Sequence, residues 1–498
     1  MSFLRAAVCH DLFTRRSKTD VTQGLVCYVV GWCVYTFYFH PLSKYPGPKL
    51  AAITQVWLAY VWLSGRYPTI IHNAHRKYGG VVRVSPNELS FDTVQAHRDI
   101  YSTPSRSKKP FIKDATFYNN GDVRVLFYEI DAVEHAWQRK LLATGFSNAA
   151  MRSQEHLIHR YVDLFVQKMG HSSVMSRGKG VNVTETIMWL GFDIMGEMTF
   201  SESFGCLESG QPHFWVSLMR DGAHAAILPA FSARMPLLRM ILPYMITKSA
   251  IENRDKHYEY TLKTVRRRIQ LQNQEAYGES SDLFGPMVAS GKLDEAQLVS
   301  MAQALVIAGA DTVSHALTGA LYFLCANPAC LEQLQHEIRG LGSYDELTGL
   351  RLATLPYLNA VLEETMRAFP PIAFGLPRVS PGDIVDGHFI PEGATVSAPH
   401  WAIMHNEAEW DDPYAFKPER WLRPNSESLP KGLAFSSGPR ACLGVSQAWL
   451  EIRIALAKLV YTYDMRFARD HGDWINEARM YMMWQEAPLM VEFGERKV

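Results

Sequence analysis

The sequence predicts an α-rich mixed α/β fold that follows a single N-terminal transmembrane helix. Long stretches with helical periodicity dominate residues 132–324, whereas short strand-like runs appear near residues 81–91 and 383–395. Residues 21–39 form an uncharged, apolar run of about the length needed to cross a bilayer once. The chain has 498 residues, of which 47% are hydrophobic, so it is long enough to bury a large core.

The apolar run divides the N-terminal part into a tail at residues 1–20, an anchor at 21–39 and a proline-rich hinge at 40–48. A cleaved signal peptide is the alternative, but the run is long for that purpose and no small-x-small cleavage site follows it. The hinge prolines should break the helix and direct residues 49–498 toward the membrane surface. Basic residues flank the run on both sides, so charge alone does not fix its orientation.

The elements of residues 49–498 follow from periodicity and from turn residues. Helices are predicted at residues 70–78, 132–142, 154–169, 184–198, 253–274 and 294–324. Strands are predicted at residues 81–84 and 88–91, near 383–395 and after residue 484, and polar loops at 172–180 and 277–282. Asp294 and Gln297 have the spacing of a capping box at the start of the longest helix.

Composition and cysteine spacing argue against several classes of function. The 50 basic and 50 acidic residues give a formal net charge of +0, which does not indicate a nucleic-acid partner. The cysteines have no CxxC pairs and no metal-finger spacing, so we expect reduced thiols in the cytosol rather than a disulfide framework. The chain contains no HExxH, GxxxxGK[ST], GxSxG or GxGxxG motif.

The most informative stretch surrounds Cys442 and reads FSSGPRACLG over residues 435–444. A lone thiolate at the mouth of a helix suits a soft metal better than a disulfide, and the positive helix end should favour the ionised sulfur. Gly438 and Gly444 allow close backbone approach, and Arg440 can pair with a carboxylate of a bound ligand. One thiolate with charge-pairing arginines is what a haem iron needs to cleave an O–O bond. The alternative is a structural cysteine in a glycine-rich turn.

This stretch resembles the haem-binding loop of the cytochrome P-450 (CYP) superfamily, Phe-x-x-Gly-x-Arg-x-Cys-x-Gly, with every fixed position present. The resemblance implies that haem b is the cofactor, with Cys442 as its axial iron ligand and Phe435 and Arg440 in the haem-binding loop. The implied fold is the CYP fold, one large helical domain with a small β-rich part near residues 49–91 and 372–400.

The centre of the longest helix reads AGADT at residues 308–312. Small residues there would leave a groove in the helix, and Asp311 beside Thr312 would form a short proton relay to a ligand held over it. The stretch resembles the oxygen-activating helix of the family, Ala/Gly-Gly-x-Asp/Glu-Thr-Thr/Ser, and departs from it at Val313, which puts the second hydroxyl in doubt. An ordinary core helix with one buried aspartate is the alternative.

Two segments resemble the structural motifs of the family. The ETMR sequence at residues 364–367 resembles the ExxR helix, and FKPERW at 416–421 resembles the second arginine segment. The resemblance implies a buried ionic triad of Glu364, Arg367 and Arg420 behind the haem loop. For ETMR alone, a solvated surface pair is the usual explanation.

Two further basic residues are expected to hold the haem propionates. Arg139 has His135 four residues before it, as is common in the third helix of the family, and Arg378 follows the ExxR helix at the usual place. Arginine pairs with carboxylates bidentately, so both assignments agree with the chemistry. Each could instead be a surface arginine.

The resemblance implies a haem-thiolate monooxygenase that uses dioxygen and electrons from NADPH through a separate reductase. Lys140 and Lys431 are candidates for docking that reductase. The stretches expected to line the pocket are apolar and predict a lipophilic substrate; they are residues 111–127, 224–235, 304–312, 372–376 and 480–484. Residues 38–49 resemble those of filamentous-fungal members that tailor secondary metabolites, so we expect a terpenoid, polyketide or alkaloid scaffold.

The resemblance also implies a single-pass protein of the endoplasmic reticulum with a cytosolic catalytic domain, in which the acceptor motif at Asn182 would stay unglycosylated. Two rival functions are a haem-thiolate isomerase or dehydratase and a non-catalytic haem-binding membrane protein. The pair of Asp311 and Thr312 argues against the first, and a relay together with an anchor argues against the second.

Overall fold

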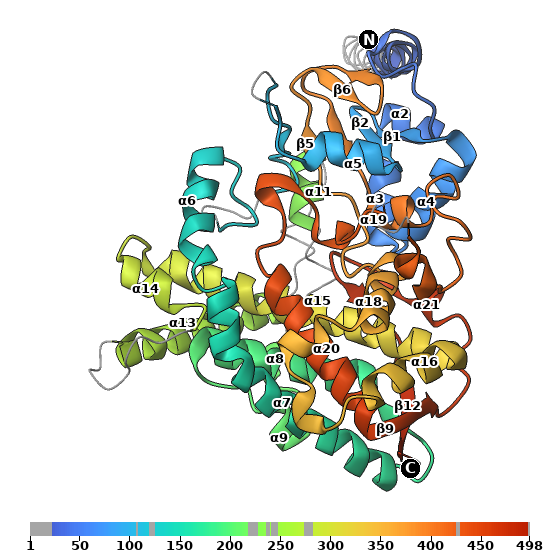
Figure 1. Cartoon of the computed structure of the whole chain (residues 1–498). Helices are drawn as coiled ribbons and strands as arrows, with labels where there is room; N and C mark the ends of the chain where they lie inside the picture. The colour runs from blue at the N-terminus through green and yellow to red at the C-terminus, as the bar shows by residue number, and fades with distance from the viewer. Residues whose placement is uncertain are drawn as a thin grey trace, which may run out of the picture.

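The computed structural model describes residues 22–105, 108–118, 125–217, 228–235, 240, 248–272, 282–424 and 429–496. It confirms a mostly helical molecule with small β-sheets. In Figure 1 the strands near the N-terminus lie at the top and the long helices fill the lower part. The predicted tail at residues 1–20 and the first anchor residue lie outside the described residues.

Most predicted helices are confirmed, with small shifts at their ends. The N-terminal half contains α2 (Lys49–Ile53), α3 (Val56–Leu63), α4 (Tyr67–Tyr78), α5 (Val94–Tyr101), α6 (Ala132–Ala143), α7 (Asn148–Met175), α8 (Val183–Phe200) and α9 (Cys206–Ser209). The C-terminal half contains α11 (Leu228–Arg234), α13 (Lys248–Gln272), α14 (Gly285–Ser290), α15 (Glu295–Ala326), α16 (Pro328–Arg339), α17 (Gly349–Leu352), α18 (Pro356–Ala368), α19 (His400–Met404), α20 (Val445–Thr462) and α21 (Trp474–Glu477). Because α7 continues to Met175, the loop predicted at residues 172–180 is wrong over its first part, and all but the last residue of the loop at 277–282 lies outside the described residues.

The main sheet has the strand order β1-β2-β8-β5-β3. Its strands are β1 (Val81–Ser85), β2 (Glu88–Phe91), β8 (Thr395–Ser397), β5 (Arg378–Val379) and β3 (Ile112–Lys113). β1 and β2 form the predicted hairpin, and β2 pairs in parallel with β8. Smaller sheets join β6 (Asp383–Val385) to β7 (His388–Ile390), β10 (Arg479–Met480) to β11 (Trp484–Gln485), and β4 (Val181–Asn182) through β12 (Met490–Glu495) to β9 (Tyr463–Phe467). The main sheet therefore combines strands from two of the predicted regions, 81–91 and 383–395, whereas the strands after residue 484 belong to smaller sheets.

Helix α15 is the central core helix. It begins with the predicted capping box, in which the Gln297 N–H donates to Asp294 Oδ1 at 2.8 Å and the Asp294 N–H donates to Gln297 Oε1 at 3.0 Å. A Cβ at Gly309 would lie 2.4 Å from the Met195 sulfur of α8, so this glycine serves helix packing and the expected groove depends on Ala308 instead. Within the described ranges, α15 is also the one helix that could cross a membrane by length and composition, but 61% of its apolar window is buried in the fold.

The N-terminal segment is helical over residues 22–34 and ends in the π-helical turn η1 (Tyr35–Phe39). Its apolar side chains are largely exposed, although over its described residues it does not meet the same length and composition test. The predicted hinge packs on β1, because the Arg83 N–H donates to the Pro46 carbonyl oxygen and Arg83 Nη1 donates to the Thr36 carbonyl oxygen, both at 2.8 Å. These bonds fix the direction in which the N-terminal helix leaves the sheet.

Candidate functional site

Cys442 lies between a tight loop and the start of α20. The loop contains the 3-10 turns η7 (Leu433–Phe435) and η8 (Gly438–Arg440), and it closes because the Cys442 N–H donates to the Phe435 carbonyl oxygen at 2.9 Å. Gly438 has a φ of +71°, and a Cβ there would lie 2.2 Å from the Tyr101 carbonyl oxygen, so only glycine fits. The loop therefore places the sulfur just before the N-terminus of α20.

The Cys442 side chain is exposed, although protein atoms surround it densely. Both observations hold if the sulfur faces a hollow inside the molecule rather than bulk water. Burial raises the pKa of the Cys442 thiol, while the Gly444 N–H and Arg139 act in the opposite direction. The Gly444 N–H thus favours the ionised sulfur as expected, but burial outweighs this effect and that of Arg139. A metal ion bound to the sulfur would displace the proton.

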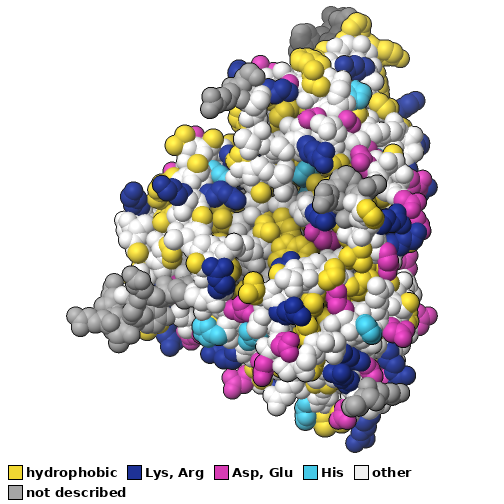
Figure 2. Space-filling model, viewed as in Figure 1, with side chains coloured by type: hydrophobic (Ala, Val, Ile, Leu, Met, Phe, Trp, Pro, Cys, Tyr) yellow, Lys and Arg dark blue, Asp and Glu magenta, His cyan; other side chains and the backbone are white. Residues whose placement is uncertain are grey.

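One face of α15 is open in the middle of an otherwise buried helix. Ala308 is exposed and Thr312 is half-buried, whereas Val306, Ala310 and Val313 are buried. The Thr312 hydroxyl donates to the Ala308 carbonyl oxygen at 2.7 Å. Figure 2 shows a hollow near the centre of the viewed face, with hydrophobic side chains inside it. Since α15 packs against α20, the open face of α15 and the exposed sulfur belong to neighbouring elements.

A set of basic side chains converges beside the cysteine loop, and we call it the basic cluster: Lys113, His135, Arg139, Arg378 and Arg440. Burial, and then the other four members with Arg440 the strongest, together lower the pKa of His135 to about 3. Burial, Arg440 and Arg378 lower the pKa of Lys113 to about 6, and Glu129 offsets part of that effect. A bound anionic group would relieve the repulsion among these side chains.

The cluster is built from segments far apart in the chain. Arg440 donates to the carbonyl oxygen of Glu129 at 2.6 Å, which joins the cysteine loop to the segment before α6. Arg139 of α6 donates to the Ala441 carbonyl oxygen at 2.7 Å, directly beside the cysteine. Arg378 of β5 is buried and donates to the Tyr118 hydroxyl at 3.0 Å. The structure thus brings together all four basic residues that were predicted from motifs.

Sequence reasoning missed Lys113, the fifth member of the cluster. It is buried in β3, and its ammonium group donates to the carbonyl oxygens of Leu126 at 3.1 Å and Phe127 at 2.6 Å. The available signal was a lysine directly after the apolar pair Phe111-Ile112, in a segment already predicted to line the pocket. A lysine there is hard to bury without an anionic partner.

The predicted triad forms behind the loop. Glu364 of α18 is fully buried and accepts two bonds from Arg367, both at 2.9 Å. Arg420 of the 3-10 helix η5 (Pro418–Leu422) donates to the same carboxylate at 3.1 Å, and Trp421 Nε1 donates to it at 2.9 Å. The guanidinium of Arg367 also donates to the Met404 carbonyl oxygen at 2.8 Å. The carboxylate is therefore fully paired, as a buried charge requires.

Part of the predicted pocket lining lies within the described residues. Phe117 and Phe374 are buried in contact with Trp62, at ring-centroid distances of 6.1 and 5.0 Å. Met480 and Trp484 are buried as well, and the indole N–H of Trp484 donates to the Pro370 carbonyl oxygen at 2.8 Å. Residues 119–124 and 224–227 of the predicted lining are outside the described part of the chain.

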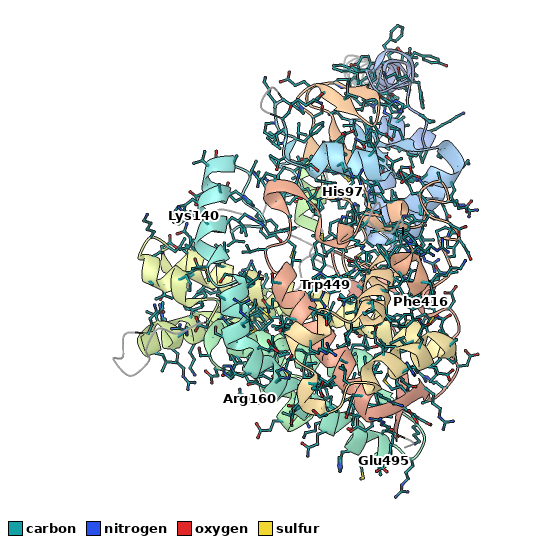
Figure 3. The ribbon with its side chains drawn as sticks, viewed as in Figure 1. His97, Lys140, Arg160, Phe416, Trp449 and Glu495 are labelled. Atoms are coloured by element: carbon teal, nitrogen blue, oxygen red, sulfur yellow. The ribbon has the colours of Figure 1, made fainter. Side chains whose placement is uncertain are left out.

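The two lysines predicted to dock a reductase are both exposed. Lys140 lies on α6 and Lys431 lies just before η7. Figure 3 shows Lys140 on the same viewed face as Trp449 of α20, whose ring lies 6.2 Å from that of Phe435 in the cysteine loop. The viewed face therefore carries both an exposed lysine and the helix that follows the cysteine.

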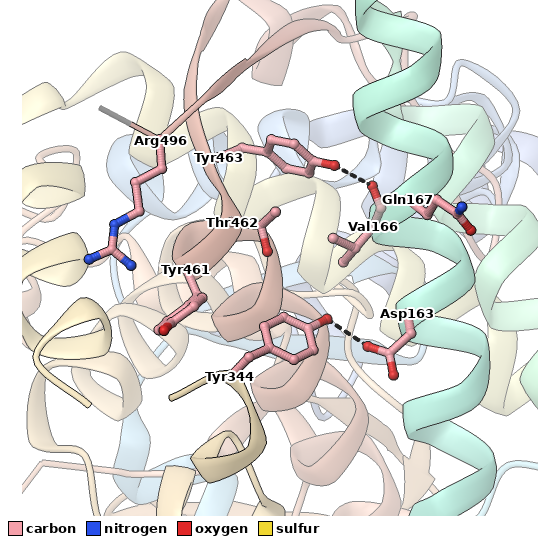
Figure 4. Close-up of a pocket in the computed structure, with 8 residues that line it drawn as sticks. All are labelled: Asp163, Val166, Gln167, Tyr344, Tyr461, Thr462, Tyr463 and Arg496. Atoms are coloured by element: carbon pink, nitrogen blue, oxygen red, sulfur yellow. Dashed lines mark hydrogen bonds between the residues drawn. The ribbon is translucent and has the colours of Figure 1, made fainter. Parts of the chain in front are cut away.

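A separate pocket of about 450 Å³ opens on the surface between α7, α20 and β9. Figure 4 shows that the Tyr344 hydroxyl donates to Asp163 Oδ1 at 2.6 Å and the Tyr463 hydroxyl donates to the Val166 carbonyl oxygen at 3.0 Å. None of the predicted site residues lines this pocket, so it is not the candidate site.

Comparison with known proteins agrees with this geometry. The profile of the family described as Cytochrome P-450 matches residues 46–493. The cytochrome P-450 monooxygenase BOA3 of Botryotinia fuckeliana is 35% identical over 485 residues, which covers 94% of each chain. The cytochrome P-450 monooxygenase poxC of Penicillium oxalicum is 37% identical over 474 residues, with 92% of this chain and 90% of the relative covered. The chain therefore belongs to the cytochrome P-450 family.

Proposed function

We propose that this protein is a membrane-anchored monooxygenase that oxidises a lipophilic small molecule in secondary metabolism. Its family supplies the class of reaction, in which an oxidoreductase incorporates an oxygen atom from dioxygen with haem b and with electrons from a reductase. The observation that carries the proposal is the Cys442 sulfur, which is surrounded by protein and yet accessible, at the start of the helix that packs against α15.

The residues present fit a haem group. Cys442 offers one sulfur ligand, and the basic cluster offers several donors for the two propionate carboxylates. When bound there, haem supplies the activation of dioxygen and the oxidation of the substrate. Phe435 and Arg440 hold the loop, while Arg139, Arg378, His135 and Lys113 bind and orient the carboxylate edge. This assignment extends the predicted set by Lys113.

Asp311 and Thr312 are proposed to hold and pass protons at the open face of α15. The Thr312 hydroxyl is anchored on the Ala308 carbonyl oxygen at 2.7 Å, which leaves its oxygen lone pairs available to a group in the hollow. Asp311 lies one residue earlier, and its side chain is 17% exposed. A carboxyl with this limited access can collect a proton from the interior and deliver it to the hollow.

The triad of Glu364, Arg367 and Arg420 is proposed to be structural. Its two arginines donate to the Glu364 carboxylate and to backbone carbonyl oxygens. Removing one member would leave buried charge unpaired, which costs about 3–5 kcal/mol in comparable networks. The triad therefore supports the loop without contacting the substrate.

Residues 21–39 are proposed as the membrane anchor, residues 40–48 as the segment that orients it, and residues 49–498 as the catalytic domain in the cytosol at the endoplasmic reticulum. The exposed apolar surface of the N-terminal helix supports this arrangement. The apolar character of the predicted lining, in which Phe117 and Phe374 are buried, supports a lipophilic substrate, with a terpenoid, polyketide or alkaloid scaffold as the class to test.

The thiolate assignment is tested with the reduced, carbon monoxide-treated protein. We expect the full chain, produced with haem, to give the thiolate-type absorption band, and Cys442→Ser to lose it while the helical circular dichroism is retained. Cys206→Ser is the matched control, because this buried thiol lies on α9 and should leave the band unchanged. A Cys442→Ser protein that keeps the band would contradict the assignment.

The reaction class is tested with the full chain and an NADPH-dependent reductase. We expect a lipophilic substrate to increase oxygen uptake and to gain one oxygen atom. Conversion of a peroxide without NADPH would favour the isomerase or dehydratase instead. Lys140→Glu and Lys431→Glu should weaken coupling to the reductase, whereas Lys179→Glu, an exposed lysine after α7, should not; equal turnover of all three would exclude the docking role.

A further inference from the structure

A buried histidine lies one turn beyond Asp311 on α15. His315 Nε2 is 3.7 Å from Asp311 Oδ1, and His315 Nδ1 is 2.5 Å from Glu486 Oε1. The side chains of His315 and Glu486 are 2% and 3% exposed, and that of Asp311 is 17% exposed. The histidine ring therefore stands between two carboxylates, of which one is fully enclosed and the other is partly exposed.

The arrangement joins two distant parts of the chain. Glu486 directly follows β11, and His315 lies in the middle of α15. On α15, Ala308, Thr312 and His315 recur at helical spacing, so the histidine continues the face that opens to the hollow. The motif reasoning that identified Asp311 did not include either residue, because their contact depends on the tertiary fold.

A carboxylate at Nδ1 fixes the orientation and protonation of the opposite nitrogen. Glu486 accepts at Nδ1, so this nitrogen carries a proton, and Nε2 is the atom that faces Asp311. A carboxyl oxygen therefore lies near each of the two ring nitrogens. The 3.7 Å separation is an ion-pair distance, so Asp311 can approach Nε2 by rotating its side chain.

We propose that His315, held in place by Glu486, is a positioning residue that orients Asp311 and holds the proton that Asp311 passes toward the open face of α15. The proton moves from His315 Nε2 to Asp311 Oδ1, which leaves a neutral imidazole and a neutral carboxyl. Glu486 keeps its bond to Nδ1, and a proton taken up from bulk solvent restores Nε2–H before the next cycle. This inference rests on the proposed role of Asp311.

The contact between Glu486 and His315 has an alternative, purely structural role. Glu486 follows the β10–β11 hairpin, so its contact with His315 could simply fasten that hairpin to α15. In that case, substitutions would lower stability and leave proton delivery unchanged. The two readings therefore differ in the solvent isotope effect and in the fraction of NADPH that is lost as hydrogen peroxide.

The test uses the full-length haem-loaded protein with an NADPH-dependent reductase. We compare His315→Gln, Glu486→Gln, Asp311→Asn and the double variants Asp311→Asn/His315→Gln and His315→Gln/Glu486→Gln. Glu486→Gln keeps an oxygen acceptor for Nδ1 and removes only the charge. The packing around residue 486 is therefore preserved. Peroxide formed per NADPH, the solvent isotope effect and the thermal unfolding midpoint are measured for each.

We expect His315→Gln and Glu486→Gln each to slow productive NADPH turnover about tenfold, as loss of a supporting residue behind a functional group commonly does, and to raise the peroxide fraction. The double variant should be no slower than Asp311→Asn, because His315 acts through Asp311. The thermal midpoints of His315→Gln, Glu486→Gln and their combination should be non-additive, a readout that is independent of turnover.

His75 of α4 provides a matched control. It is also buried, and its Nδ1 lies 3.7 Å from Asp92 Oδ2, but it lies in a different element from Asp311. His75→Gln should lower the midpoint without changing the peroxide fraction. If Asp311→Asn impairs turnover while His315→Gln and Glu486→Gln do not, the inference is wrong and the role of Asp311 stands. If Asp311→Asn has no effect, the proposed relay itself is wrong.

Discussion

At the scale of single residues, Ser436 is the most strained position of the cysteine loop. Its φ is 60° and its ψ is −168°, a combination that glycine adopts readily and that other residues avoid. The conformation is imposed from both sides, because the Ser436 N–H donates to the Leu433 carbonyl oxygen and the Phe435 carbonyl oxygen accepts from Cys442. The strain therefore lies in the loop that presents the sulfur.

We predict that Ser436→Gly stabilises the protein. Relief of a strained backbone of this kind is worth about 1–3 kcal/mol, and the added freedom of the unfolded glycine offsets roughly 0.5–1 kcal/mol of it. A higher thermal unfolding midpoint with an unchanged carbon monoxide band is the expected result. Ser437→Gly is the control, since Ser437 has an ordinary φ of −141° and would lose its 3.3 Å contact with Ser102. A lower midpoint for Ser436→Gly would contradict the strain argument.

Glu451 of α20 is a buried carboxylic acid, and few hydrogen bonds offset the cost of its burial. It is 2% exposed, and Gln447 Nε2 donates to its Oε1 at 2.7 Å. Burial raises the pKa of Glu451 to about 8, and the bond from Gln447 opposes that shift. The carboxyl also borders a small cavity beside Val313, the position where the sequence departs from the family pattern of α15. The neutral acid is therefore the form that the fold accommodates.

The pKa of Glu451 sets the direction of a pH effect on stability. Because the folded state holds this proton more tightly than the unfolded chain does, its contribution is fully present below pH 4.5 and is lost as the pH rises toward about 8. We predict that Glu451→Gln removes this loss, with a difference that approaches about 1.4 kcal/mol per pH unit between those limits. Denaturant unfolding of both proteins at pH 5 to 9 measures it; parallel pH profiles would contradict the prediction.

At the scale of elements, Arg234 fastens α11 to the main sheet. It donates to Glu88 Oε2 at 2.9 Å, to Asp114 Oδ2 at 2.7 Å and to the Thr116 hydroxyl at 2.7 Å. Burial raises the pKa of Glu88 against the effect of Arg234, whereas for Asp114 the guanidinium and Thr116 outweigh burial and lower the pKa. Arg234 therefore links α11, which belongs to the predicted pocket lining, to the carboxylates of Glu88 and Asp114.

We predict that Arg234→Met loosens α11, because it leaves two buried carboxylates close together without a cation. Amide hydrogen exchange over residues 228–235 should become at least severalfold faster, while exchange in α15 stays unchanged. Adding Glu88→Gln and Asp114→Asn should restore part of the protection by removing the unpaired charges. Arg254→Met, at an exposed ion pair on α13, is the control and should leave α11 unaffected. Unaltered exchange of α11 in Arg234→Met would show that packing alone holds it.

Local signals predicted the elements that depend on local interactions. The cap at Asp294 and the apolar periodicity after it were sufficient for α15, and the turn at residues 85–87 was sufficient for the β1–β2 hairpin. The end of α7 was not predicted, because its polar residues are kept helical by distant partners, such as Ser173, whose hydroxyl accepts from the Phe493 N–H at 2.9 Å. A sequence pattern does not reveal a hydrogen bond between residues so far apart in the chain.

The same limit applies to the candidate site. Motifs identified Cys442, the triad and most of the basic cluster, because those residues occupy recognisable local patterns. Lys113, His315 and Glu486 were missed, since each acquires its role from a partner in another segment. Burying a charged side chain requires such a partner, so the charged residues that sequence reasoning missed are those whose partners are distant.

At the scale of the whole molecule, the N-terminal helix continues into a second exposed apolar surface. Trp32 Nε1 donates to the Ile53 carbonyl oxygen at 2.8 Å, which joins the helix to α2. Exposed apolar side chains follow on α2 and α3, namely Leu50, Val56, Tyr60 and Leu63. We call these four residues the α2–α3 surface. An apolar surface continuous with the proposed membrane anchor is expected to rest on the same bilayer.

We predict that removing residues 1–39 weakens membrane binding without abolishing it. The full chain should float completely with phospholipid vesicles, and the truncated chain should float in part, even at high salt, because apolar contacts are not screened. Replacing the four residues of the α2–α3 surface with serine in the truncated chain should remove the remaining binding. Val174→Ser and Leu350→Ser, at exposed apolar positions on α7 and α17, are controls that should keep it. Complete loss of flotation on truncation alone would exclude the α2–α3 surface as a membrane contact, whereas a full chain that stays in solution would exclude the anchor itself.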